Sequence, residues 1–234
     1  DMSEAQSKLY EAVRATVQEN IRQIIAEKGF KRSQIQILEA LLKLRQVCCH
    51  PSLLKLEDIS PNKANSAKLE QLLEMVTEMV EEGRKILIFS QFTSMLQLIE
   101  DRLKTQGIDF VKLTGQTKKR EEVINAFQSG QVPVFLISLK AGGVGLNLTA
   151  ADTVIHYDPW WNPAAEDQAS DRAWRIGQDK PVFVYKLITN HSIEEKILAL
   201  QKNKAQLAQS ILSHDQEHDV KLSEDDMMKL FETF

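Results

Sequence analysis

The sequence predicts an α/β fold in which a parallel β-sheet is sandwiched by helices, with an N-terminal helical appendage and a C-terminal bracing helix. Four short runs are almost wholly apolar, at residues 86–89, 134–137, 153–157 and 182–188. Strands that are apolar on both faces are typical of a parallel sheet that helices cover. Helical patterns fill the intervals between these runs, and such alternation of strand and helix favours an α/β sandwich.

Composition sets the broad class. The 234 residues suit one or two domains, and 43% hydrophobic with 26% charged residues is ordinary for a globular chain. A net charge of −4 argues against nucleic-acid binding by bulk charge alone but permits a local basic groove. No apolar run approaches the roughly 18 residues of a membrane span, so we expect no membrane partner. The adjacent Cys48 and Cys49 suit a reducing cytosol or nucleus.

Helices are expected over residues 1 to about 50, the helical connector (1–66) of our domain prediction. Helically spaced apolar residues mark two segments: Leu9, Val13, Val17, Ile21 and Ile24, then Ile37, Leu41, Leu44 and Val47. The second helix should stop before Pro51. A loop at 60–66 separates it from an amphipathic helix over 67–82. The helical pattern is already running at Asp1, so we expect a fragment of a longer protein.

The main lobe is expected over 67–190, with a sandwich of the RecA type beginning near residue 84. Residues 110–113 supply a weaker fifth strand, and helices should cover 93–105, 118–128 and 163–175. The remainder, 191–234, reads as a bracing helix and tail. Ser192 with Glu195, and Ser223 with Asp226, are spaced as capping boxes at two helix starts.

A glycine-rich stretch follows the strand at 134–137. Gly142, Gly143 and Gly145 fit either a tight strand-to-helix turn or a backbone cradle for phosphate. The dinucleotide fingerprint fails, because Leu148 occupies the third glycine position. Lys140 shifts the balance toward phosphate, since a cation at a helix N-terminus helps to hold that anion.

The segment after Asn162-Pro163 predicts a helix with a polar face. Gln168, Arg172 and Arg175 are spaced i, i+4, i+7, so their side chains share one side of the helix. Planar cations beside a phosphate cradle are typical of phosphoryl-transfer sites. The structural alternative is a salt-bridged surface helix in which Asp171 pairs with Arg175.

Aromatic and histidine residues leave other readings open. The two tryptophans of Asp158-Pro-Trp-Trp-Asn suit either base stacking or packing against a neighbouring lobe, with packing slightly favoured. His50, beside the cysteines, lacks the ligand count of a metal site, so core packing is expected and no metal ligands are predicted. His156 lies in an apolar strand and should be buried or hydrogen-bonded.

Taken together, these segments resemble the second RecA-like lobe of Swi/Snf-type ATPases of helicase superfamily two. The resemblance covers nearly the whole chain in order: LYEAV near residue 9, LRQVCCHP (44–51), ILIFSQF (86–92), LTG (113–115), SLKAGGVGLNL (138–148), DQASDRAWRIGQ (167–178) and IEEKIL (193–198). It implies an ATP-driven translocase on double-stranded DNA that remodels protein–DNA complexes and displaces a bound protein without separating strands.

The resemblance also implies roles for individual residues. Arg172 and Arg175 would be arginine fingers that reach ATP, with Gln168 beside the phosphates. Gly145 and Asn147 match positions near the nucleotide. The positions that match contacts to the DNA backbone are Ser90, Gln91, Thr114, Gly115, Ser138, Lys140 and Gly142. Backbone contacts are independent of base sequence, as a motor that tracks along DNA requires.

Two departures from the family pattern matter. Leu139 stands where threonine usually precedes the basic residue, which puts one hydroxyl–phosphate contact in doubt. The chain also has neither a GxxxxGK[ST] phosphate loop nor a DExH box. ATP and Mg²⁺ should therefore be bound mainly by an N-terminal RecA-like lobe, the second expected partner besides double-stranded DNA, and this fragment alone should not hydrolyse ATP.

Several details resemble bacterial members. We expect a cytoplasmic protein that is nucleoid-associated if it is bacterial, in which case nucleosomes are not its substrate, and nuclear if it is eukaryotic. Two rival functions stay open: the lobe of a superfamily-two RNA helicase, and a non-catalytic nucleic-acid-binding module. Substrate assays separate the first rival, and the residues upstream of Asp1 separate the second. The displaced complex, regulation, oligomeric state and the role of the acidic tail stay open.

Overall fold

The computed structural model describes residues 1–55, 65–141, 146–159, 171–173, 180–203 and 223–234. The chain divides into two compact units, each described here by itself. The sheet unit is Leu69–Leu187. The helical unit combines Asp1–Lys68 with Ile188–Phe234, so the expected N-terminal connector and C-terminal brace make up one unit.

The helical unit contains the two long helices that the apolar spacing predicted. Helix α1 spans Glu4–Lys28, begins at the Ser3 cap and ends at Gly29, whose φ of +81° suits glycine. Helix α2 spans Gln34–Cys49 and stops before Pro51, as expected. Short 3₁₀ turns cover Lys31–Ser33 and Pro51–Leu53. Both α1 and α2 bury their apolar stripes.

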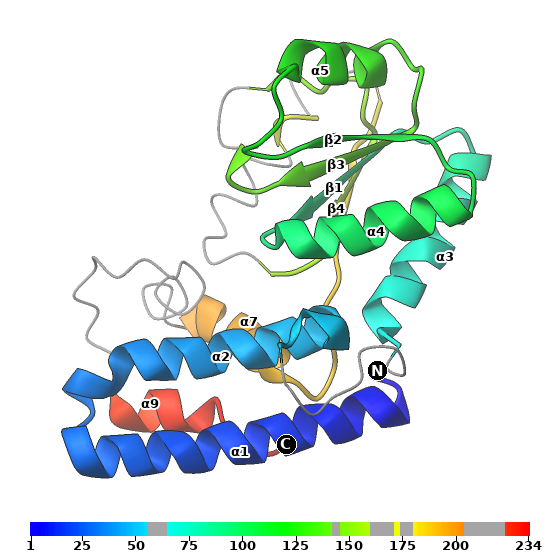
Figure 1. Ribbon diagram of the computed structural model, residues 1–234. Coiled ribbons are helices and arrows are strands. Elements are labelled where there is room, and N and C mark those ends of the chain that lie inside the picture. The colour runs from blue at the N-terminus through cyan, green and yellow to red at the C-terminus, as the bar shows by residue number, and fades with distance from the viewer. Residues whose placement is uncertain (56–64, 142–145, 160–170, 174–179, 204–222) are drawn as a thin grey trace. The chain divides into compact units, whose positions relative to one another are not determined.

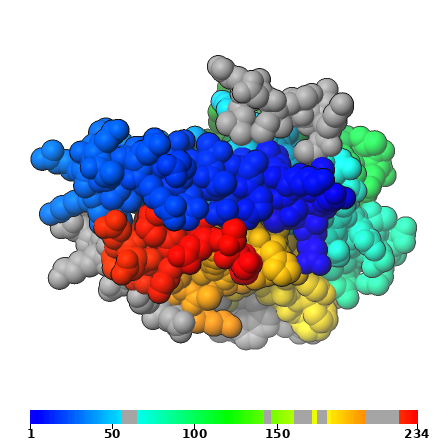
Figure 2. Space-filling model, turned by 90° about the horizontal axis from the view of Figure 1, so that it is seen from below, coloured from blue at the N-terminus to red at the C-terminus, as the bar shows by residue number. Residues whose placement is uncertain are grey.

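Segments far apart in the sequence hold this unit together. Helix α7 spans Ile193–Asn203. The amide of its first residue, Ile193, donates a hydrogen bond of 2.8 Å to the Tyr10 hydroxyl of α1. Helix α9 (Glu224–Lys229) starts at Ser223, whose hydroxyl accepts from the Asp226 amide, as predicted. Figure 2 shows the C-terminal residues lying along α1, where the Arg14 guanidinium donates 2.7 Å to the Phe231 carbonyl.

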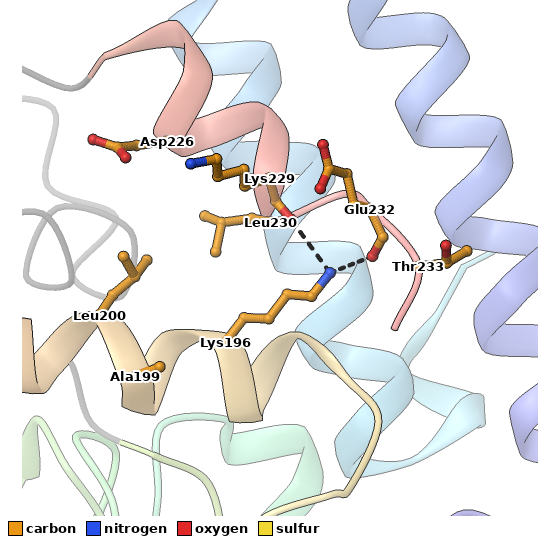
Figure 3. Close-up of a pocket in the computed structure, with 8 residues that line it drawn as sticks. All are labelled: Lys196, Ala199, Leu200, Asp226, Lys229, Leu230, Glu232 and Thr233. Atoms are coloured by element: carbon orange, nitrogen blue, oxygen red, sulfur yellow. Dashed lines mark hydrogen bonds between the residues drawn. The ribbon is translucent and has the colours of Figure 1, made fainter.

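The contact between α7 and α9 is drawn in Figure 3. The Lys196 ammonium donates to the carbonyls of Lys229 and Glu232 at the end of α9. A cation near the C-terminus of a helix satisfies carbonyls that the helix leaves unpaired. The aliphatic side of Lys196 borders a pocket of about 310 Å³ whose lining includes Leu200 and Leu230.

The sheet unit has the predicted α/β architecture. Its strands are β1 (Ile86–Ser90), β2 (Phe110–Leu113), β3 (Val134–Ser138), β4 (Thr153–His156) and β5 (Phe183–Lys186). The described strands form a parallel sheet in the order β2-β3-β1-β4-β5. The described helices are α3 (Ala67–Glu81), α4 (Thr93–Thr105) and α5 (Arg120–Gln128), and Figure 1 shows α4 lying alongside the sheet. The helix expected over 163–175 falls almost wholly outside the described residues.

One strand departs from the expected double burial. Strands β1, β3 and β4 are buried along their whole length, but Phe183 and Val184 of β5 are each 45% exposed. The reason is position, because β5 is the edge of the described sheet and has β4 on one side only. Its apolar composition predicted a strand correctly and burial wrongly.

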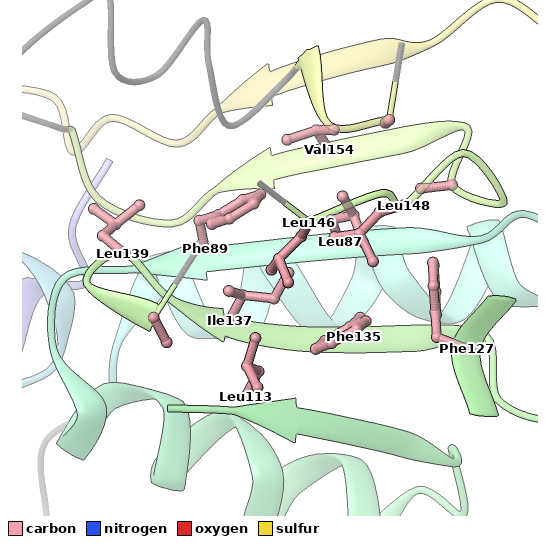
Figure 4. Packing of buried hydrophobic residues seen from close by; sticks show 13 residues of the cluster. Leu87, Phe89, Leu113, Phe127, Phe135, Ile137, Leu139, Leu146, Leu148 and Val154 are labelled. Carbon is pink, nitrogen blue, oxygen red and sulfur yellow. The ribbon is translucent and has the colours of Figure 1, made fainter. Parts of the chain in front are cut away.

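An apolar cluster of described residues joins one side of the sheet to the segment that follows β3 (Figure 4). The alternation of side chains along a strand brings Leu87 and Phe89 of β1 into this cluster together. Phe127 of α5 meets Phe135 of β3 edge-on, with ring centroids 5.4 Å apart. The chain between β3 and β4, called the glycine-rich segment here, contributes five members of the cluster: Leu139, Ala141, Leu146, Leu148 and Ala151. The core therefore reaches to the residues that bear the candidate site.

Candidate functional site at the carboxyl ends of the strands

The predicted site residues gather at one edge of the sheet. Ser90, Thr114 and Ser138 lie at or just after the ends of β1, β2 and β3. Since these strands are parallel, their carboxyl ends meet at the same edge. Ligands of open α/β sheets bind outside this edge. The order of the strands therefore brings together residues separated by up to about fifty positions in sequence.

Ser90 connects three of the loops at this edge. Its carbonyl accepts 3.2 Å from the Leu139 amide, which ties the segment after β3 to β1. Its hydroxyl donates 2.5 Å to Asp158 after β4 and accepts 3.1 Å from the Phe92 amide. The Ser90 side chain is fully buried. This hydroxyl therefore shapes the turn instead of facing a ligand in this structure.

Asp158 is a site residue that sequence reasoning missed. Its side chain is buried, and its second carboxylate oxygen accepts 3.0 Å from the Gln91 amide. In the sequence of this segment only Trp160 and Trp161 stood out, and both lie outside the described residues. The available signal was an acid directly after a buried apolar strand, because a buried carboxylate requires partners.

The turn after β2 is held by its own threonines. The Thr114 amide donates 3.0 Å to the Thr117 hydroxyl, and the Thr117 amide donates 3.1 Å to the Thr114 carbonyl. The Gln116 amide donates to the Thr114 hydroxyl. Gly115 at the tip is exposed. Hydroxyls that satisfy nearby amides define such a turn without help from a sheet or helix.

At the end of β3 and after it, the described residues include both buried and exposed side chains. Ser138 is 3% exposed and its hydroxyl accepts 3.3 Å from the Ala141 amide. Leu139 is buried in the apolar cluster, whereas Lys140 and Asn147 are exposed. The leucine at the usual threonine position therefore contributes to the core in this chain.

The glycine-rich segment is joined to the arginine segment. The Leu148 amide donates a hydrogen bond of 3.1 Å to the carbonyl of Arg172, and Arg172 is partly exposed. This contact brings Asn147 near the segment that carries the predicted arginine fingers. Gln168, Arg175, Gly142 and Gly145 lie outside the described residues.

The other residues that sequence analysis considered have structural roles. His156 is buried and stacks on Phe89, with ring centroids 5.6 Å apart, as expected. His50 is half-buried, and its Nδ1 accepts 3.0 Å from the Ser52 amide, so it caps a turn instead of packing in the core. Cys48 and Cys49 are buried and form no disulfide. Burial raises the pKa of the Cys48 thiol.

Comparison with known proteins defines the class and then the family. The model of the helicase conserved C-terminal domain matches residues 67–177, so the sheet unit is a helicase-type RecA-like lobe. The SWI2/SNF2 ATPase C-terminal domain of Sulfolobus solfataricus is 32% identical with a TM-score of 0.73, covering 100% of this chain and 95% of that one. The chain belongs to the SWI2/SNF2 ATPase family and corresponds to its C-terminal lobe.

Two further relatives extend the comparison. The Sulfolobus solfataricus SWI2/SNF2 ATPase core in complex with dsDNA is 36% identical, with a TM-score of 0.77 over 100% of this chain and 49% of that one. A putative ATP-dependent helicase/translocase of Bacillus subtilis, YwqA, is 41% identical over 92% of this chain and 23% of its own length. The chain spans about a fifth of the curated relatives it matches. None of the described helices is long and apolar enough to cross a membrane.

Proposed function

We propose that this chain is the second motor lobe of an ATP-dependent translocase that moves on double-stranded DNA and remodels protein–DNA complexes. The observation that carries this proposal is the hydrogen bond between Leu148 and Arg172. It joins the predicted nucleotide segment to the arginine segment at the edge where the DNA-contact positions also gather. The dsDNA bound by the archaeal ATPase core and the translocase name of the Bacillus protein support the same function.

ATP and Mg²⁺ are assigned mainly to the N-terminal RecA-like lobe of the full-length protein. The residues present fit the phosphates of ATP, because Lys140 is exposed and the partly exposed Arg172 is joined to the segment that follows it. Bound ATP supplies a γ-phosphoryl group whose transfer develops charge on oxygen. Arg172 and Arg175 would neutralise that charge, Gln168 would bind near the phosphates, and Gly145 and Asn147 would contact the nucleotide.

The DNA backbone is assigned to the turns at the carboxyl edge. Gln91, Thr114, Gly115, Lys140 and Gly142 are the proposed contacts. Ser90 and Ser138 belong to the same set but would act by fixing turns, since both side chains are buried and accept a backbone amide. Contacts to phosphate make binding sensitive to salt and independent of base sequence.

The deciding measurement is ATP hydrolysis by the full-length protein with duplex DNA, with single-stranded RNA and with no nucleic acid. We expect strong stimulation by duplex DNA and no strand displacement. Stimulation by RNA would favour the helicase alternative, and hydrolysis unaffected by any nucleic acid would contradict the motor. We also propose a reducing, nucleoid-associated location, which the two buried thiols suit.

Arg175→Ala tests the arginine finger. The full-length variant should lose DNA-stimulated hydrolysis, by about a thousandfold or more, while it still binds duplex DNA. Arg84→Ala is the matched control, because Arg84 precedes β1 and lies at the opposite edge of the sheet. Equal turnover in the Arg175 variant and the control would overturn the assignment.

A further inference from the structure

We infer that helix α5 holds the chain in place on both sides of the glycine-rich stretch, at Ala141 and at Thr149 and Ala150. We call this role of α5 a splint, and Arg120 and Gln128 are its positioning residues for the motor reaction. These are the first and last residues of α5. The inference rests on the proposed function for its effect on turnover, and on the contacts below for its geometry.

Arg120 holds the start of the segment. Its guanidinium Nη2 donates 2.9 Å to the carbonyl of Ala141, which is itself buried. A charged donor makes a stronger hydrogen bond than a neutral one, particularly when the acceptor is shielded from water. The backbone at Ala141 is therefore fixed from outside its own strand, directly before Gly142.

Gln128 holds the end of the same segment. Its side-chain oxygen accepts 2.8 Å from the Ala150 amide, and its nitrogen donates 3.4 Å to the Thr149 hydroxyl. One side chain thus satisfies two groups of a stretch that lies outside the sheet. Arg120 and Gln128 lie eight positions apart on one helix, about 12 Å along its axis, so a single helix contacts the chain both at Ala141 and at Thr149 and Ala150.

The sheet supports the splint itself. Phe127 of α5 is fully buried in the apolar cluster, and Val123 and Ile124 pack against it. Leu146 and Leu148 of the glycine-rich segment belong to the same cluster. The helix and the described part of the segment therefore share one core, and the polar residues at the two ends of α5 hydrogen-bond to backbone groups at Ala141 and Ala150.

This arrangement leaves Lys140 and Asn147 exposed on a segment whose ends are held. Fixing the backbone at Ala141 and Ala150 before ligands bind removes part of the entropy cost of the reaction. Neither Arg120 nor Gln128 needs to touch a ligand for this effect. Because Gln128 is neutral, Arg120 and Gln128 do not form a pair of phosphate-binding cations.

The test uses the full-length protein with Arg120→Ala, Gln128→Ala and Gln128→Glu. The glutamate keeps an acceptor for the Ala150 amide, so it should rescue the alanine variant. Asn125→Ala is the control, since Asn125 is exposed on the same helix. The readouts are hydrogen exchange of residues 139–151 and DNA-stimulated turnover, with thermal unfolding to check the fold.

We expect faster exchange at 139–151 and about a tenfold fall in kcat for both alanine variants, with KM for DNA nearly unchanged. Unchanged exchange in both variants would overturn the splint, as would faster exchange without any fall in kcat. A rise in KM for Arg120→Ala alone would instead make Arg120 a phosphate ligand. If the wild type showed no DNA stimulation, the proposed function would fail while hydrogen exchange still decided the splint.

Discussion

The Ser90 hydroxyl donates a 2.5 Å hydrogen bond to the carboxylate of Asp158, and both side chains are buried. Ser90 is the last residue of β1 and Asp158 follows β4, and these two adjacent parallel strands are far apart in the sequence. The same carboxylate also accepts from the Gln91 amide. The shape of the first turn at the candidate site thus depends on an acid contributed by another loop.

Removing that acid should destabilise the sheet unit. Asp158→Ala removes the acceptor of the buried Ser90 hydroxyl and of the Gln91 amide, so we expect the free energy of unfolding to fall by about 3 kcal/mol. Asp158→Asn should lose less, because its amide oxygen still accepts one bond. Urea unfolding measures both, with the exposed Asp109→Ala as control. Equal unfolding midpoints for the alanine variant and its control would show that the contact contributes nothing.

The helical unit contains a buried ion pair that makes a second prediction. The Lys68 ammonium lies 2.6 and 2.8 Å from the two Glu194 carboxylate oxygens, and these side chains are 3% and 1% exposed. Glu194 also accepts 2.9 Å from the Thr189 amide. Burial disfavours the charged ammonium, whereas the attraction and hydrogen bonds of the Glu194 carboxylate favour it, and the net effect raises the pKa of Lys68.

Glu194→Ala should therefore lower the free energy of unfolding by about 3–5 kcal/mol, because it leaves a buried cation without its carboxylate. Replacing the pair together, with Lys68→Met and Glu194→Met, should recover much of that loss. A double-mutant cycle by urea unfolding measures the coupling. The exposed Lys8–Glu4 pair is the control and should show no measurable coupling. Additive effects at Lys68 and Glu194 would contradict the prediction.

The same unit should lose stability in alkali. Burial raises the pKa of the Tyr10 hydroxyl and of the Cys48 thiol above their ordinary values of 10.0 and 9.0. The folded state then keeps both groups neutral, whereas the unfolded chain ionises them. Their stabilising contribution is complete below about pH 9 and is lost as the pH rises further.

Thermal unfolding between pH 7.5 and 11 measures this loss, and Tm should begin to fall near pH 9. Tyr10→Phe should be less stable at neutral pH, since it removes the acceptor for the Ile193 amide. Its further decline above pH 10 should be shallower than that of the wild type. A Tm that stays constant to pH 11 would mean that neither group is buried in solution.

Leu139 offers a test of the departure from the family pattern. Leu139→Thr restores the usual residue but places a hydroxyl in the apolar cluster and removes methyl groups from it. We expect the free energy of unfolding to fall by about 2 kcal/mol, with no gain in affinity for duplex DNA. Urea unfolding and DNA titration check the two parts. Tighter DNA binding by the threonine variant would show that the side chain faces the ligand.

Local patterns predicted much of the fold. The four apolar runs and the weaker segment at 110–113 located the five described strands, and α3, α4 and α5 begin and end within a few residues of their expected bounds. Ser223 caps its helix as its spacing implied, whereas the Ser192 hydroxyl accepts from the Glu194 amide and Glu195 accepts from that of His191. These features depend on residues a few positions apart, so the chain itself encodes them.

The candidate site was predictable only in part. Ordered motifs located the loops after β1, β2 and β3, but a motif does not tell whether a side chain faces a ligand or the core. Ser90 and Leu139 are buried for reasons that lie in other strands. Asp158, Arg120 and Gln128 were missed because each acts on backbone more than twenty positions away.

The sequence by itself determined the family, the positions of the strands and the types of residue at the carboxyl edge, because spacing and composition are local. The tertiary structure alone decided that β5 is an exposed edge, that Ser90 pairs with Asp158 and that α5 braces the glycine-rich segment. Each of these depends on strand order, which places distant residues within hydrogen-bonding distance. Burial then makes the geometry of those contacts matter, since an unsatisfied polar group is costly away from water.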